Sequence, residues 1–238
     1  ILSFAPFSDC IVTPSVFKGS FGSKHVTFKG FMELCYLHPN YFSSNKSIIS
    51  ELGLRDEEPY SVLRFVSWNA NHDIGQSGIS LNEKLELVRR ISKKMRVFIS
   101  SEGHLPDDLL KYRISISPEK IHSILAYASL YLGEGATMAS ESAILGTPAI
   151  YINSLTAGTI EAQQRYGLLF SYRNINGVFD KLEELRGDLP NMVSSLENSI
   201  NALKTDISEK EVAQKESVEK TNGSEKQEKA NIRKIDEK

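Results

Sequence analysis

The stretch SLYLGEGATMASESAILGTPAIYIN, residues 129–153, decides the fold. It opens with a short apolar run at 130–132, which breaks at a glycine turn before the good helix formers of residues 136–145. Gly146 stands where a helix C-cap glycine belongs, and a second apolar run follows at 149–152. This pattern predicts a parallel β-α-β unit whose strands are buried on both faces.

The glycine turn of this stretch is a candidate anion site. A helix N-terminus carries unpaired amides and the positive end of a dipole. Gly133 and Gly135 let an anion approach the backbone that continues into Ala136, and Thr137 and Ser140 add hydroxyl groups. The turn is therefore suited to hold a phosphate group.

A carboxylate follows on the same helical face. Glu141 comes four residues after Thr137, where it is placed to accept hydrogen bonds from ribose hydroxyls. The third glycine of the dinucleotide fingerprint is missing, so we do not expect an NAD site. The alternative is a tight turn with a capped helix and no ligand.

Composition excludes several classes of function. The 238 residues carry 28 basic and 30 acidic side chains, a net charge of −2, which does not suggest a nucleic-acid partner. The two cysteines, Cys10 and Cys35, have no metal-binding spacing and fit a reducing cytoplasm. No apolar run reaches the roughly twenty residues of a transmembrane segment, and no signal peptide is visible. We expect a cytoplasmic protein without metal or cofactor.

Strands and helices alternate from Tyr60 to Tyr172, which predicts one doubly wound, Rossmann-like α/β domain. Ser80 and Glu83 form a capping box at the start of an amphipathic helix. From Ser208 onward, eight basic and eight acidic side chains among 31 residues predict a solvated helix or a disordered tail. The strands expected in the domain are residues 60–68, 97–100, 113–116, 130–132, 149–152 and 168–172, and the later helices are 117–127, 176–186 and 191–203.

Polar residues follow the expected strands at their carboxyl ends, where ligands bind in open α/β sheets. The loop 69–78 carries Asn71, His72 and Asp73, and Glu102 follows the next strand. The alternative for this loop is an exposed connector whose Asn and Asp residues cap turns. His38 lies in an aromatic-rich connector, residues 31–42, either as a catalytic candidate or as a buried histidine bonded to backbone.

Residues 117–150, SPEKIHSILAYASLYLGEGATMASESAILGTPAI, resemble the carboxy-terminal half of GT-B sugar-nucleotide enzymes. The closest resemblance is to a family of uncharacterised predicted glycosyltransferases, a domain of unknown function. Its relatives include UDP-N-acetylglucosamine 2-epimerase and the N-acetylglucosaminyltransferase of peptidoglycan synthesis. PFSDC at 6–10, YLHP at 36–39 and NHDIG at 71–75 also resemble that family.

This resemblance implies two Rossmann-like domains that face each other across a cleft, with no metal requirement. The residues that match the phosphate-binding turn are Gly133, Gly135, Ala136 and Thr137. Glu141 matches the acid that takes the ribose, and Ile116 the strand end where backbone grips the base. Asp73 replaces the arginine of a His-Arg motif in the 2-epimerases, which puts epimerase chemistry in doubt.

The resemblance also suggests a division of the chain. Residues 1–40 would be the end of a truncated N-terminal domain and its connector, 41–190 the nucleotide-sugar-binding domain, and 191–238 a C-terminal helix and charged tail. Because the chain starts at Ile1, inside an apolar run, we expect that the N-terminal part of a longer protein is absent.

The leading hypothesis is the donor-binding portion of a metal-independent GT-B glycosyltransferase, incomplete in this chain. Its expected partners are a nucleotide-sugar, most simply a UDP-sugar, and a glycan or lipid-linked acceptor; a homo-oligomer is left open. The alternatives are a non-hydrolysing 2-epimerase-like enzyme, a non-catalytic nucleotide-sugar-binding protein, and a plain Rossmann-like domain for another nucleotide.

Overall fold

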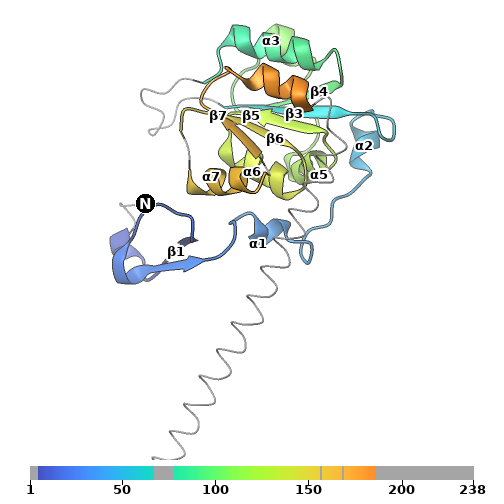
Figure 1. Ribbon diagram of the computed structural model, residues 1–238. Coiled ribbons are helices and arrows are strands. Elements are labelled where there is room, and N and C mark those ends of the chain that lie inside the picture. Colours follow the sequence, from blue (N-terminus) through green and yellow to red (C-terminus); the bar gives the residue numbers. More distant parts are fainter. Residues whose placement is uncertain (1–4, 67–77, 156, 168, 186–238) are drawn as a thin grey trace, which may run out of the picture. The chain divides into compact units, whose positions relative to one another are not determined.

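A five-stranded parallel sheet organises the residues that the computed structural model describes, which are 5–66, 78–155, 157–167 and 169–185 (Figure 1). The strand order is β4-β3-β5-β6-β7, and every pairing in it is parallel. This sheet confirms the predicted doubly wound α/β fold. The strands are β3 (Tyr60–Phe65), β4 (Arg96–Ser101), β5 (Leu130–Gly133), β6 (Ala149–Ile152) and β7 (Leu169–Tyr172).

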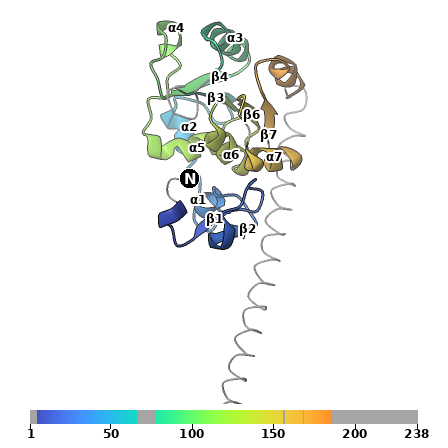
Figure 2. The same ribbon diagram turned by 90° about the vertical axis from the view of Figure 1, so that its left-hand side faces the viewer.

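Helices cover both faces of the sheet (Figures 1 and 2). One face carries α3 (Leu81–Ile91) and the helical residues 178–185, and the other carries α5 (Ile121–Ala126), α6 (Ala136–Ile144) and α7 (Gly158–Arg165). Burial on two sides explains why β5 and β6 are apolar throughout, since all four residues of each strand are buried.

The strand order has a switch point between β3 and β5. From β3 the chain crosses to β4 on one side, and from β4 it returns to β5 on the other side. Ligands of doubly wound sheets bind at such a point, outside the carboxyl ends of the strands. The residues at the ends of β3 and β5 are therefore the first place to look for a site.

The focal stretch folds as its pattern predicts, as β5, α6 and β6. Gly146 follows the end of α6 with a φ of 92°, a left-handed conformation that favours glycine. The capping box is confirmed as well. The Ser80 hydroxyl accepts from the Glu83 amide, and the Glu83 carboxylate accepts from the Ser80 amide.

The strand expected at 113–116 is wrong. Only an isolated bridge joins Arg113 to Ile99 of the edge strand β4. Pro118 has no amide to donate, and the chain turns into the 3-10 helix η4 (Pro118–Lys120) directly before α5. The pairing with β4 therefore does not extend beyond this bridge.

Smaller elements precede the sheet. A two-stranded parallel sheet joins β1 (Ile11–Pro14) to β2 (His25–Phe28). The connector 31–42 contains a short helix, α1 (Leu34–Leu37). The remaining short helices are η1 (Ala5–Phe7), η2 (Gly22–Lys24), α2 (Ile48–Glu51) and α4 (Asp107–Leu110).

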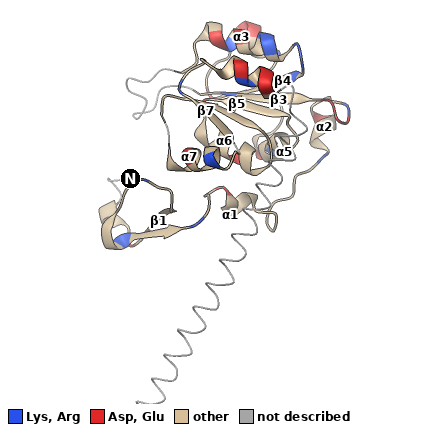
Figure 3. Cartoon of the chain, viewed as in Figure 1, with Lys and Arg blue, Asp and Glu red and all other residues tan. Residues whose placement is uncertain are grey.

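Charged side chains of both signs lie along α3 (Figure 3). Glu86 accepts from Arg89 and Arg90, whose guanidinium groups lower the pKa of its carboxyl to about 2. Within the described part of the chain, no helix is long and apolar enough to cross a membrane.

Candidate functional site

The turn between β5 and α6 lies at the switch point. Gly133, the last residue of β5, has no room for a side chain, because an added Cβ would lie 2.6 Å from Tyr131 Oη and 2.8 Å from the Arg64 carbonyl oxygen. An added Cβ at Gly135 would have its nearest neighbour, Arg64 Cγ, at 3.6 Å, which is ordinary contact. Packing therefore requires glycine at 133, whereas the protein leaves space at 135.

The amino terminus of α6 keeps its amides open. Gly135 is the N-cap residue, and no side chain caps the helix. Among the described residues no protein acceptor is found for the amides of Ala136, Thr137 and Met138, and Thr137 is exposed. This is the arrangement that binds anions at helix N-termini. By contrast, the Glu134 amide donates to the Arg64 carbonyl.

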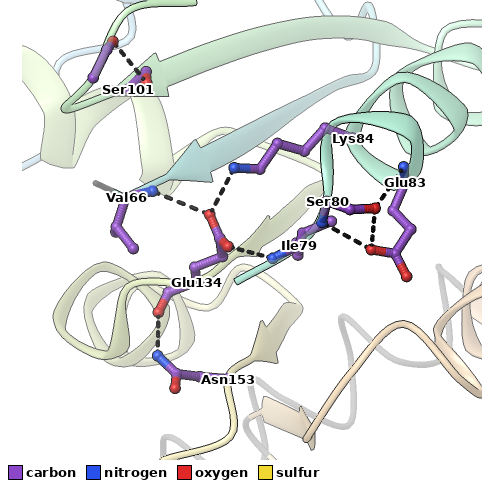
Figure 4. A network of polar contacts seen from close by, with 9 residues as sticks. Val66, Ile79, Ser80, Glu83, Lys84, Ser101, Glu134 and Asn153 are labelled. Atoms are coloured by element: carbon purple, nitrogen blue, oxygen red, sulfur yellow. Dashed lines mark hydrogen bonds and ion pairs between the residues drawn. The ribbon is translucent and has the colours of Figure 1, made fainter. Parts of the chain in front are cut away.

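Glu134 is the most buried carboxylate of this turn, with a fully buried side chain (Figure 4). Its Oε1 accepts from the Ile79 amide at 2.6 Å, and its Oε2 accepts from the Val66 amide at 3.1 Å. Lys84 Nζ of α3 lies 3.4 Å from Oε2. The Glu134 carbonyl also accepts from Asn153 Nδ2 at 3.0 Å, at the end of β6. Glu134 thus ties the ends of β3 and β6 and the start of α3 to the turn.

The end of β4 supplies a second group of polar side chains. Arg64 donates to Ser100 Oγ and to Glu102 Oε1, both at 2.6 Å. Glu102, a candidate ligand residue, is therefore paired with the arginine of the neighbouring strand. Ser101 Oγ donates to the Gly103 carbonyl and closes the turn after the strand (Figure 4).

Glu141 lies on α6, five residues after Ala136, and it is contacted from two other elements. Its Oε1 accepts from the Tyr36 hydroxyl at 2.9 Å and lies 3.1 Å from His122 Nε2. Tyr36 belongs to α1 in the connector, and His122 to α5. Burial, followed by the bond to Glu141, raises the pKa of the Tyr36 phenol, so the phenol stays protonated and donates.

The other candidates on described residues lie apart from this cluster. Ser140 is buried, and its Oγ accepts from Gln163 Nε2 of α7 at 2.5 Å. His38 is half-buried, and its Nδ1 accepts from the Asn40 amide at 3.2 Å, as expected of a histidine bonded to backbone. Ile116 is half-buried in the loop before η4. Asn71, His72 and Asp73 lie outside the described residues.

The sequence reasoning missed three residues that the structure places here. Glu134 had a signal, since an acid between two glycines directly after a buried strand is unusual. Neither His122, on the helix expected at 117–127, nor Tyr36 was singled out as a site residue. Neither had a local signal, because each meets Glu141 only through packing of distant elements.

A cavity of about 340 Å³ lies away from this site. Its lining comes from the amino-terminal side of the sheet, including Pro59, Met95 and Leu130, and from Phe179 and Leu185. It is therefore at the opposite edge from the turn. Among the described residues, no group of three or more His, Cys, Asp or Glu side chains is gathered in a way that would hold a metal ion.

A family model described as "Protein of unknown function (DUF354)" matches residues 4–166. One relative is an uncharacterized protein of Methanocaldococcus jannaschii, MJ0665, which is 28% identical over 155 residues. That alignment covers 61% of this chain and 45% of the relative, so the chain spans less than half the length of the relative it matches.

Three solved structures show similarity at low scores. The wall teichoic acid polymerase TagF (H444N, with CDPG) has a TM-score of 0.48 and 11% identity, covering 87% of this chain and 59% of that one. Spinosyn forosaminyltransferase SpnP has a TM-score of 0.47 and 13% identity, and the match covers 83% of this chain and 51% of that one. UDP-GlcNAc 2-epimerase from Neisseria meningitidis, bound to UDP-GlcNAc, has a TM-score of 0.43 and 14% identity, and the match covers 68% of this chain and 47% of that one. Scores below 0.5 say nothing of what this chain binds.

Proposed function

The chain belongs to the DUF354 family, and on that premise we propose that its α/β domain binds a nucleotide-sugar as the donor-binding part of a glycosyltransferase. The diphosphate would lie on the open amides at the start of α6, and a ribose hydroxyl would bind the Glu141 carboxylate.

The observation that carries the proposal is the pairing of two open groups on one helix. The amides of Ala136, Thr137 and Met138 have no protein acceptor among the described residues. Glu141 follows Thr137 by one turn, about 6 Å along the helix axis. A phosphate and the ribose attached to it are spaced on this scale, so one nucleotide can use both groups.

The same amides would serve the chemistry. Glycosyl transfer from a nucleotide-sugar leaves negative charge on the departing diphosphate. Amides aimed at that charge, together with the helix dipole, stabilise it as it develops. The catalytic candidates Asn71, His72 and Asp73 remain proposals, as does His38, whose Nδ1 already accepts from backbone.

Calorimetric titration of UDP, CDP, ADP and GDP into the chain tests binding. We expect at least one of them to bind, and we expect Glu141→Ala to weaken that binding about tenfold or more, because a charge-assisted hydrogen bond is lost. The matched control is Glu161→Ala, which removes an exposed glutamate of α7 that pairs with Lys18. Absence of binding by all four, or equal affinity in Glu141→Ala, contradicts the proposal.

Product analysis with the full-length protein then separates the enzymatic alternatives. A transferase releases nucleoside diphosphate and a glycosylated acceptor, whereas a 2-epimerase returns an epimerised nucleotide-sugar. Binding without either product favours a non-catalytic nucleotide-sugar-binding protein.

A further inference from the structure

The Glu141 carboxylate is held asymmetrically. Oε1 takes both protein contacts, from Tyr36 at 2.9 Å and from His122 at 3.1 Å. Within the described residues, Oε2 has no protein donor. The buried side-chain atoms that lack a partner there are Glu33 Oε2 and Gln163 Oε1, so Oε2 of Glu141 is not a fully buried atom. Oε2 is therefore the oxygen that solvent, or a ligand, can reach.

Of the two residues on Oε1, His122 is half-buried, whereas Tyr36 is 42% exposed and packs against the His122 ring. The His122 ring lies between two rings of the connector, with its centroid 5.6 Å from that of Tyr36 and 5.9 Å from that of Phe42, the latter edge-on. The His122 side chain is 25% exposed and that of Glu141 is 10% exposed. The contacts with these two rings limit the rotamers of His122, so its donor is aimed at Oε1.

Resting on the proposed function, we propose that Tyr36 and His122 are positioning residues for ribose recognition. They fix Oε1 of Glu141 and thereby aim Oε2 at a hydroxyl of the bound nucleotide. The connector 31–42 thus takes part in the nucleotide site, although it precedes the sheet in the sequence. Neither side chain touches the ligand in this arrangement.

A rival arrangement makes the opposite prediction. If the Tyr36 hydroxyl held the place of a ribose hydroxyl, its removal would free Oε1 and tighten binding. If Tyr36 positions the carboxylate, its removal lets Glu141 rotate and weakens binding. The sign of the change in affinity separates the two.

The test uses calorimetry to compare whichever of UDP, CDP, ADP and GDP binds best with its 2′,3′-dideoxy analogue, which lacks both ribose hydroxyls. The measured quantity is a ratio, the dissociation constant of the dideoxy analogue divided by that of the nucleoside diphosphate, and it is determined for each variant. A high ratio means that the ribose hydroxyls contribute to binding. We expect the ratio to fall about threefold to tenfold in Tyr36→Phe and in His122→Phe, which keep a ring and lose the donor. A general loss of structure weakens both ligands alike and leaves the ratio unchanged.

Two further variants serve as a rescue and a control. His122→Gln places an amide N–H near the position of Nε2, and it should restore the ratio. Tyr127→Phe is the matched control, because its hydroxyl contacts Ser44 of the chain before the sheet and not Glu141. We expect Tyr127→Phe to keep the ratio of the unchanged protein.

Each outcome has one meaning. Absence of binding by UDP, CDP, ADP and GDP alike, or a ratio near one that Glu141→Ala does not alter, overturns the proposed function and this inference with it. A high ratio that is lost in Glu141→Ala but kept in Tyr36→Phe and His122→Phe overturns the inference alone. Tighter binding of the nucleoside diphosphate by Tyr36→Phe also overturns it.

A measurement on the unchanged protein without ligand tests the inference even if the variants fail to fold. Imidazole nitrogen NMR of the unliganded protein at pH 8 should show the His122 proton on Nε2, where it donates to Glu141. A proton on Nδ1 instead would mean that His122 does not hold the carboxylate, and the inference would fail.

Discussion

Gly133 and Gly135 stand two residues apart, and they are glycine for different reasons. At Gly133 the protein itself excludes a Cβ, because backbone and side-chain atoms of Arg64 lie below 3 Å from its position. At Gly135 the φ is −89° and no neighbour is closer than 3.6 Å, so the protein would accept a side chain there. A requirement for glycine at 135 would come from a ligand.

Alanine at each position separates packing from binding. We expect Gly133→Ala to destabilise the fold by about 1–3 kcal/mol in urea unfolding, as overpacked cores do. Gly135→Ala should unfold near the unchanged protein and yet bind nucleoside diphosphate more weakly, if the diphosphate approaches the backbone of this turn as proposed. Full binding by Gly135→Ala would mean that the diphosphate does not approach this turn.

Glu134 is a buried charge that three donors satisfy. In Glu134→Gln an NH₂ group replaces one accepting oxygen, so a buried amide or Lys84 loses its partner. We expect a loss of about 2–4 kcal/mol in the free energy of unfolding, measured by urea titration. The control Glu184→Gln, an exposed glutamate that pairs with Lys181, should change it much less. Equal effects of the two changes would contradict the network.

At the scale of elements, helix starts differ in how they are capped. The start of α3 is closed by the capping box of Ser80 and Glu83. The start of α6 has no side-chain cap, and that of η4 has none either, although Ser117 stands at its N-cap. The start of α6 is half-buried to exposed, so its amides are open to water and to an anion.

Removal of each N-cap hydroxyl tests this difference. Ser80→Ala should lower the free energy of unfolding by about 1 kcal/mol, because the Glu83 amide loses its acceptor. Ser117→Ala is the matched control, since the Ser117 hydroxyl donates to the Glu119 side chain and caps no amide of η4. A similar loss in both variants would show that the box contributes nothing of its own.

At the scale of the whole molecule, a ligand at the switch point should stabilise the fold. A ligand that binds only the folded state adds about 2.7 kcal/mol when its concentration is a hundred times its dissociation constant. For a domain of this size we expect the melting temperature to rise by about 5–10 °C in a thermal-shift assay with the best nucleoside diphosphate. The corresponding nucleoside, without phosphate, should give a much smaller rise. Equal rises would place recognition away from the α6 amides.

Local patterns in the sequence were sufficient for the central elements. Apolar runs, a glycine turn and the C-cap glycine predicted β5, α6 and β6, and two side chains three residues apart predicted the capping box of α3. These features depend on atoms a few residues apart, so the chain encodes them directly. The open amides before Glu141 belong to this class.

Only the tertiary structure decided what surrounds those elements. Tyr36 meets Glu141 across 105 residues, and Glu134 joins Val66 to Ile79 from 68 and 55 residues away. The prediction of a strand at 113–116 was wrong for the same reason, since a strand there depends on pairing with the edge strand β4. Contacts of this kind follow from how helices and strands pack, and no spacing along the chain reveals them.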